Sequence, residues 1–127
     1  MTIQIHEDGG GDPPGFELGE LRKIFGSDEQ GLAEVLQLYA KDLGQWLSDW
    51  NVAQSHQELG VMQKLSHTLL GSSGMCGALQ TSTLARKVND ALQDSGPAPD
   101  ELVASLIASV EDNQRQIALW GNRPIQS

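Results

Sequence analysis

Apolar residues recur at alternating steps of three and four positions along most of this chain, which is the spacing of one face of an α-helix. The longest run without a break comprises Leu32, Leu36, Tyr39, Leu43, Trp46, Trp50 and Ala53. At 1.5 Å per residue this stripe spans roughly 32 Å, which is long enough for a principal helix of a helical bundle. Because both tryptophans share the stripe, we expect them in the core.

A shorter helix precedes the long one. The stretch from Phe16 to Phe25 carries apolar residues at helical spacing, and Gly26 is a typical residue to end it. Ser27 and Gln30 have the spacing of a capping box, so the sequence predicts that the long helix begins there.

Three further helices follow the long one. The first of them ends shortly before Ala78. The next has inward positions at Leu84, Val88, Ala91 and Leu92, and Ser95-Gly96-Pro97 is a typical stop signal after it. The stripe of the last helix comprises Leu102, Leu106, Val110, Asn113, Ile117 and Trp120.

No segment alternates with a period of two residues for long, so the sequence predicts no strands. Four substantial amphipathic helices with short connections favour an all-α, antiparallel four-helix bundle, with one short extra N-terminal helix. Residues 1–15 are rich in glycine and proline and nearly free of apolar residues, which predicts a flexible tail. The bundle is expected over residues 16–121, followed by a short C-terminal tail at 122–127.

Composition and charge narrow the class of function. The 127 residues suit one domain with a real core. The net charge of −9 argues against binding to nucleic acid or to anionic membranes. The single cysteine, Cys76, cannot form an intramolecular disulfide and is expected as a small core residue. With no signal peptide or long apolar run in view, we expect a monomeric cytoplasmic protein.

The helix that ends near Ala78 carries the most informative residues. At 100° per residue its expected buried stripe comprises Met62, Leu65, Leu69 and Ser72. His67 points away from this stripe, and the positions four and seven residues later are Gly71 and Gly74. Each glycine costs a helix about 0.5–1 kcal/mol relative to alanine. Two of them beside an exposed imidazole indicate either close packing or the approach of a partner.

Other chemistries find little support. A single surface histidine on a helix most often has no function. The spacings of His56, His67 and Cys76 match no zinc pattern, so we expect no metal site. The Gly9–Gly11 run lacks the lysine and serine of a phosphate-binding loop, and the serines near His67 lack a nucleophile elbow.

The residues around His67 resemble the histidine-containing phosphotransfer (HPt) domains of phosphorelays. Their signature is a histidine followed by x-Leu-Lys-Gly-Ser-Ser or Ala and, a few residues later, an apolar-Gly-Ala end. The residues that match it in unbroken register are His67, Leu69, Gly71, Ser72, Ser73, Gly77 and Ala78. The lysine of the signature is replaced by Leu70. The resemblance covers roughly residues 16–120.

The resemblance implies a function for His67. A neutral imidazole nitrogen is a competent nucleophile near pH 7, so His67 would be the phospho-acceptor. The expected partners are a hybrid histidine kinase and the receiver domain of a response regulator, between which the phosphoryl group would pass. Mg²⁺ is expected on the receiver, and no cofactor on this chain. No autonomous kinase or hydrolase activity is expected.

The resemblance also suggests how the surroundings of His67 act. Lys64, one turn before His67, and Asn89, on the next helix, are candidate neighbours of the phosphoryl group. The expected docking face comprises Gln63, Leu70, Gly71 and Gly74, extended by Met75 or Leu18. The alternative left open by Leu70 is a non-catalytic helical adaptor that binds and inhibits a histidine kinase or a receiver domain.

Overall fold

The computed structural model describes residues 12–94 and 96–121, which form five α-helices and no strand. The helices are α2 (Gly19–Phe25), α3 (Glu29–Ser55), α4 (Leu59–Met75), α5 (Leu79–Asp94) and α6 (Asp100–Gly121). The prediction of an all-α chain with a short extra N-terminal helix is therefore confirmed.

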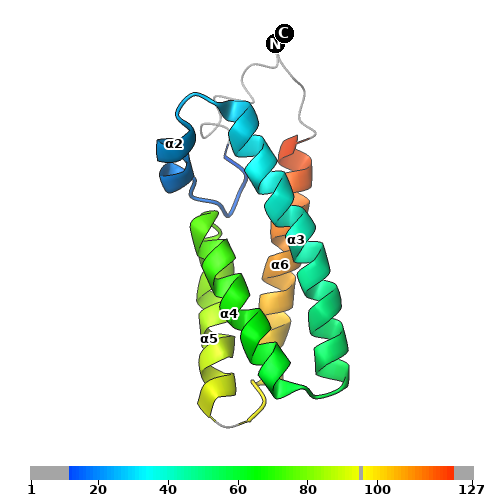
Figure 1. Ribbon diagram of the computed structural model, residues 1–127. Helices are drawn as coiled ribbons and strands as arrows, with labels where there is room; N and C mark the ends of the chain where they lie inside the picture. The colour runs from blue at the N-terminus through cyan, green and yellow to red at the C-terminus, as the bar shows by residue number, and fades with distance from the viewer. Residues whose placement is uncertain (1–11, 95, 122–127) are drawn as a thin grey trace.

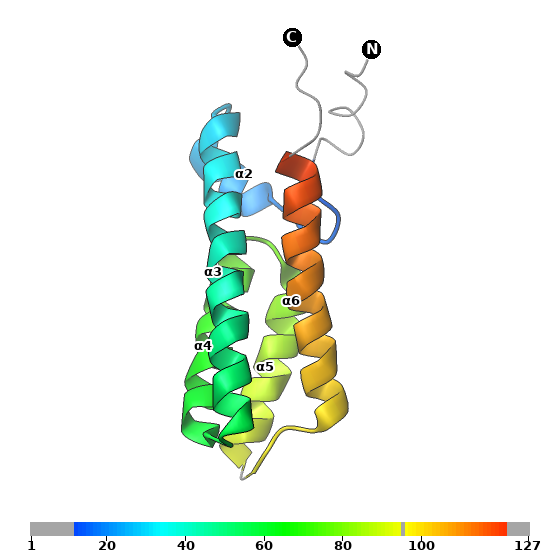
Figure 2. The same ribbon diagram turned by 90° about the vertical axis from the view of Figure 1, so that its right-hand side faces the viewer.

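The four long helices lie side by side and run antiparallel, as Figures 1 and 2 show. α3 packs against α4 and α6, and α5 packs against the same two helices, so the four form a closed bundle. The α3–α4 and α5–α6 connections lie at one end (Figure 1). The α4–α5 turn lies toward the opposite end, where α2 packs against α3.

The stripe predicted for the long helix is buried in α3 at every position. Trp46 and Trp50 stack with their ring centroids 5.2 Å apart. The indole nitrogen of Trp46 donates a hydrogen bond of 2.8 Å to the backbone carbonyl of Leu65, so one indole ties α3 to α4. Both tryptophans belong to the core, as the sequence predicted.

Polar residues near the α4–α5 turn cross-link all four long helices. The Tyr39 hydroxyl lies 3.0 Å from both Ser73 Oγ and Asn113 Oδ1. Thr81 Oγ1 donates to Asn113 Oδ1 at 2.7 Å and lies 2.6 Å from Ser109 Oγ. Burial raises the pKa of Tyr39 well above its ordinary value, so its hydroxyl keeps its proton. Because buried polar groups must find specific partners, this network fixes how the helices sit against one another.

The predicted buried face of α4 was partly wrong. Its buried residues are Met62, Ser66, Leu69 and Ser73, whereas Leu65 is half-buried and Ser72 is exposed. Two serines can enter the core because each hydroxyl finds a partner. Ser66 Oγ donates to the Gln63 carbonyl at 2.9 Å, and Ser73 Oγ accepts from Tyr39. The buried face of α4 therefore includes Ser66 and Ser73 in place of the predicted Leu65 and Ser72.

Smaller corrections apply to the neighbouring helices. In α6 the first buried position is Val103 rather than Leu102, which is half-buried. In α5 Leu84 and Ala91 are half-buried, since Thr81, Ala85 and Asn89 share the buried face with Val88 and Leu92.

The helix boundaries also correct two predictions: α2 begins at Gly19 rather than at Phe16, and α3 has a different N-cap. α2 ends at Gly26, as expected, where φ is +58°. The N-cap of α3 is Asp28, whose side chain accepts a 2.9 Å hydrogen bond from the Gly31 amide. The capping box expected from Ser27 to Gln30 is therefore wrong, because the adjacent carboxylate fills the capping position.

The segment before α2 packs on the end of the bundle. Pro13 is fully buried, and Asp12 forms an ion pair of 2.7 Å with Arg22. Asp12 and Pro13, which belong to the predicted tail, thus contact the folded part of the chain, while residues 1–11 and 122–127 lie outside the described residues. Leu18 is only 1% exposed, so the prediction that it extends the docking face for a partner is wrong.

The same segment crosses the α4–α5 turn at close range. The Glu17 amide donates a 2.8 Å hydrogen bond to the Gly77 carbonyl. Gly77 has φ +79°, and a Cβ placed there would collide with the Glu17 carbonyl. Glycine is required at this turn for both reasons.

Candidate functional site

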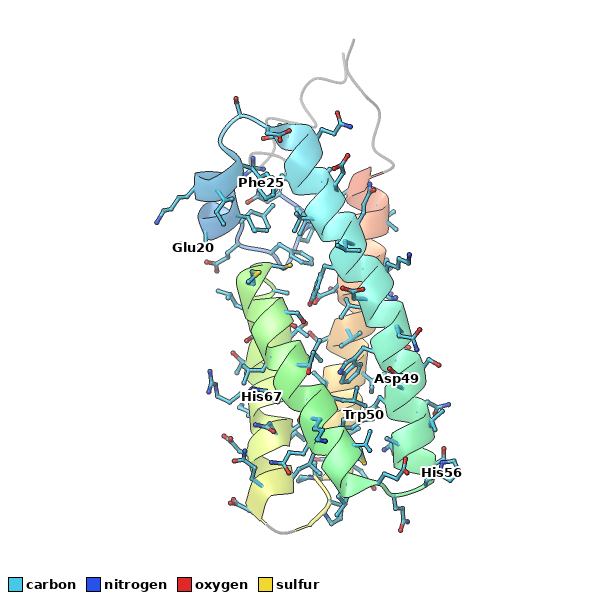
Figure 3. All side chains as sticks on the ribbon, in the orientation of Figure 1. Glu20, Phe25, Asp49, Trp50, His56 and His67 are labelled. Atoms are coloured by element: carbon cyan, nitrogen blue, oxygen red, sulfur yellow. The ribbon has the colours of Figure 1, made fainter. Side chains whose placement is uncertain are left out.

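His67 lies on α4 well away from both ends of the helix, with its side chain exposed (Figure 3). Within residues 12–94 and 96–121 it makes no side-chain hydrogen bond and no ion pair. This exposure agrees with the helical phase expected from the sequence. Among the described residues, only the helix backbone therefore fixes the position of the imidazole, and the ring is accessible to a partner protein.

A shallow hollow beside His67 runs between α4 and α5. It is lined by Gly60, Gln63, Lys64, His67, Thr68, Asn89 and Gln93. The structure thus brings four predicted site residues together, namely Gln63, Lys64, His67 and Asn89. The other predicted residues, Leu70, Gly71 and Gly74, do not line it.

Glycines leave the surface next to His67 bare over several turns. A Cβ added to Gly71 would meet nothing within 4 Å, and the same holds for Gly60, seven residues before His67. At Gly74 a Cβ would lie 3.4 Å from Ser82 Oγ. Packing inside the bundle therefore does not require Gly60 or Gly71. Sequence reasoning missed Gly60, although the seven-residue spacing that singled out Gly74 points to it.

Asn89 connects the core to the hollow. Its residue is 6% exposed, and its Oδ1 accepts a 3.4 Å hydrogen bond from Ser66 Oγ. The amide nitrogen has no hydrogen-bond partner in the described part of the chain, and it is accessible to solvent. Asn89 therefore presents a positioned donor to any group bound in the hollow.

Two residues near His67 define its local charge. Lys64 is exposed and forms no ion pair with any described residue. Leu70 is half-buried and packs against the core, and its backbone carbonyl accepts a 3.1 Å hydrogen bond from Ser82 Oγ. The position that carries lysine in the HPt signature is thus partly a packing position in this chain.

The α4–α5 hairpin differs in charge from the rest of the molecule. From residue 59 to residue 94 three basic residues stand against two acidic ones, Lys64, Arg86 and Lys87 against Asp90 and Asp94. The whole chain carries a net charge of −9. The hairpin with His67 therefore lacks the excess of negative charge that the whole chain carries and that would repel an anionic group.

No cluster of three or more histidine, cysteine or acidic residues within 12–94 and 96–121 could hold a metal ion. His56 lies at the end of α3, far from His67 (Figure 3), and its Nδ1 is 3.0 Å from the Val52 carbonyl. Cys76 is buried, and burial raises the pKa of its thiol to about 11. No helix in the described ranges has the length and apolar character to cross a membrane.

Comparison with known proteins identifies the family. No curated protein and no solved structure matches the chain significantly. The family model described as the Hpt domain matches residues 31–117, which is more than half of the sequence and includes all of α4 and α5. The chain belongs to the histidine-containing phosphotransfer domain family, and this membership implies phosphotransfer in two-component signalling.

Proposed function

We propose that this protein is a phosphorelay intermediate that accepts a phosphoryl group on His67 and passes it to or from the aspartate of a receiver domain. The observation that carries the proposal is an exposed imidazole that has no hydrogen-bond partner among the described residues, together with a bare surface on both sides of it along α4. A receiver must bring its aspartyl phosphate to the ring, and glycines at 60 and 71 leave room for that approach.

The transfer step needs little from this chain. The lone pair of an unprotonated ring nitrogen forms the bond to phosphorus, the other nitrogen keeping its proton. The bond from phosphorus to the aspartyl oxygen breaks, and its electron pair stays on the receiver carboxylate. Catalysis of such a step is mainly positioning and electrostatic stabilisation. The bundle contributes the positioning, and Mg²⁺ on the receiver contributes most of the charge.

Neighbouring side chains assist the phosphorylated state. The free amide of Asn89 donates a hydrogen bond to a phosphoryl oxygen, and Ser66 holds the Asn89 side chain in place. Lys64 contributes positive charge from the same hollow. In this proposal the phosphoryl group passes between a hybrid histidine kinase and a response regulator, and the relay operates in the cytoplasm.

The receiver docks over the outer face of the α4–α5 hairpin. Gln63, the exposed part of Leu70, Gly71 and Gly74 form the centre of this docking face. Met75, 69% exposed, and Leu79, 45% exposed, extend it with apolar surface toward the α4–α5 turn. Large apolar side chains exposed in one region of a surface are typical of a binding surface.

Incubation with a phosphorylated receiver or hybrid kinase tests the proposal. The protein should acquire a label that is labile in acid and stable in base, as a phosphohistidine is. His67→Gln should abolish labelling, whereas the matched control His56→Gln should label normally. Binding to the kinase or receiver without any label would instead support the inhibitory adaptor.

A further inference from the structure

The replacement of the signature lysine by Leu70 raises the question of which residue neutralises phosphorylated His67. Lys64 supplies one positive charge from α4. We propose that Arg86 on α5 supplies a second and contacts the phosphoryl oxygens directly. This inference rests on the proposed function of His67 and adds a residue that the sequence pattern did not single out.

Two hydrogen bonds fix the position of Arg86 relative to α4. Ser82 Oγ donates to the Leu70 carbonyl at 3.1 Å, and Ser66 Oγ donates to Asn89 Oδ1 at 3.4 Å. Arg86 lies four residues after Ser82 and three before Asn89, so it shares their side of α5. The stretch of α4 opposite Arg86 therefore lies between Ser66 and Leu70, which is the turn that contains His67.

The guanidinium of Arg86 is available to bind an anion. The residue is exposed and has no ion pair with any other described residue, although Asp90 stands one turn later. By contrast, Lys23 and Arg115 are each paired with a carboxylate on their own helix. Arginine presents several donors in a planar fork, a geometry that suits a phosphoryl group.

The helix positions of Arg86 and Lys64 lie on opposite sides of His67. At 100° per residue Lys64 lies about 60° from His67 around α4 in one direction, and Ser66 lies about 100° away in the other. Ser66 faces α5 through its contact with Asn89. Arg86 therefore occupies the flank on which Leu70 carries no charge, and it supplies from α5 the positive charge that a lysine at position 70 would supply.

Lys87 offers a matched control because it is the next residue and carries the same charge. It is exposed and makes no ion pair with the described residues. It lies about 160° around α5 from Asn89, so its side chain starts from the side of the helix away from α4. Neutralising Lys87 changes the net charge of the protein as much as neutralising Arg86 does.

The experiment phosphorylates the full chain chemically with phosphoramidate, which avoids any need for a cognate kinase. The titration of the phosphoryl group on His67 is then followed by phosphorus NMR. A nearby cation favours the dianionic phosphoryl group, so Arg86→Gln should raise its proton affinity by up to about fivefold. Lys87→Gln should change it by much less. Arg86→Lys should leave the proton affinity of the phosphoryl group close to that of the unaltered protein. Leu70→Lys should bring it back toward that value in the Arg86→Gln background.

Two results would overturn the inference in distinguishable ways. Equal shifts for Arg86→Gln and Lys87→Gln would mean that only overall charge acts, and Arg86 would have no role at the site while the proposed function stood. Absence of phosphohistidine at position 67 in the unaltered protein would overturn the proposed function and this inference together.

Discussion

The inward and outward faces of α4 treat polar side chains in opposite ways. On the inward face Ser66 and Ser73 are fully buried, and each hydroxyl has a partner, reaching Asn89 and Tyr39 on other helices. On the outward face His67 has no partner in the described part of the chain, and Gly71 has no neighbour for an added Cβ. The inward face fixes where the helix lies, and the outward face leaves the His67 side chain accessible to another molecule.

This difference predicts where each substitution acts. Changes on the inward face should lower the free energy of unfolding, because buried polar groups lose partners or the core becomes overpacked. Changes on the outward face should leave stability nearly unchanged, because surface substitutions usually fall within ±0.5 kcal/mol. They should alter binding and transfer instead.

The largest effect on stability is expected from Ser73→Leu. The residue is fully buried, and its Oγ lies 3.0 Å from the Tyr39 hydroxyl. The larger side chain would overpack this position and remove a hydrogen bond, at a cost of about 2–4 kcal/mol. Urea denaturation measures this loss. Ser72→Leu is the matched control, because Ser72 is the exposed neighbour and its change should cost less than about 0.5 kcal/mol.

Gly71→Leu should show the reverse pattern. With nothing within 4 Å of an added Cβ, the helix should gain up to about 1 kcal/mol, because leucine is the better helix former. Receiver affinity should fall by about tenfold or more, which corresponds to about 1.4 kcal/mol of lost binding. Calorimetric titration with the receiver measures this change. Unaltered affinity and transfer would show that the receiver does not approach over Gly71.

The sequence predicted the outward face of α4 better than the inward one. A histidine opposite an apolar stripe is recognisable from periodicity alone, and the continuous stripe of α3 needed no other information. The burial of Ser66 and Ser73 was not predicted, because a serine is buried only where its hydroxyl has a hydrogen-bond partner. These partners lie on other helices, α5 and α3. Contacts that join distant segments are not encoded in local spacing.

The same reason explains the errors at the N-terminal end. Leu18 was expected to extend the docking face, yet it is buried where its segment crosses the α4–α5 turn. A separate case is Arg86, which the sequence pattern did not single out. Its position relative to His67 depends on how α5 is aligned with α4. That alignment follows from hydrogen bonds between the helices, which only the structure reveals.

Ser66→Ala is the change that links the two faces. It removes a hydroxyl that donates to the Gln63 carbonyl at 2.9 Å and contacts Asn89 Oδ1 at 3.4 Å, at a cost of about 1 kcal/mol. The side chain of Asn89 would no longer be held toward the hollow, so transfer should slow by a few-fold. Labelling reactions quenched at successive times measure the transfer rate, and urea denaturation measures the loss of stability. Transfer at the unaltered rate would contradict the role assigned to Ser66.

The smallest effect is expected from Leu70→Lys, which restores the signature lysine. Because Leu70 is half-buried and packs against the core, the aliphatic stem of lysine should keep part of its contact while the ammonium reaches solvent. An exposed charge contact is worth roughly 0–1 kcal/mol, so the equilibrium with the receiver should shift toward phosphorylated His67 by less than about fivefold. Arg86 and Lys64 already supply positive charge, which reduces the gain further. In a Lys64→Ala background the same substitution should therefore act more strongly. If Leu70→Lys changed neither the equilibrium nor the phosphohistidine half-life in either background, the electrostatic account would fail, and Leu70 would serve only in packing and docking.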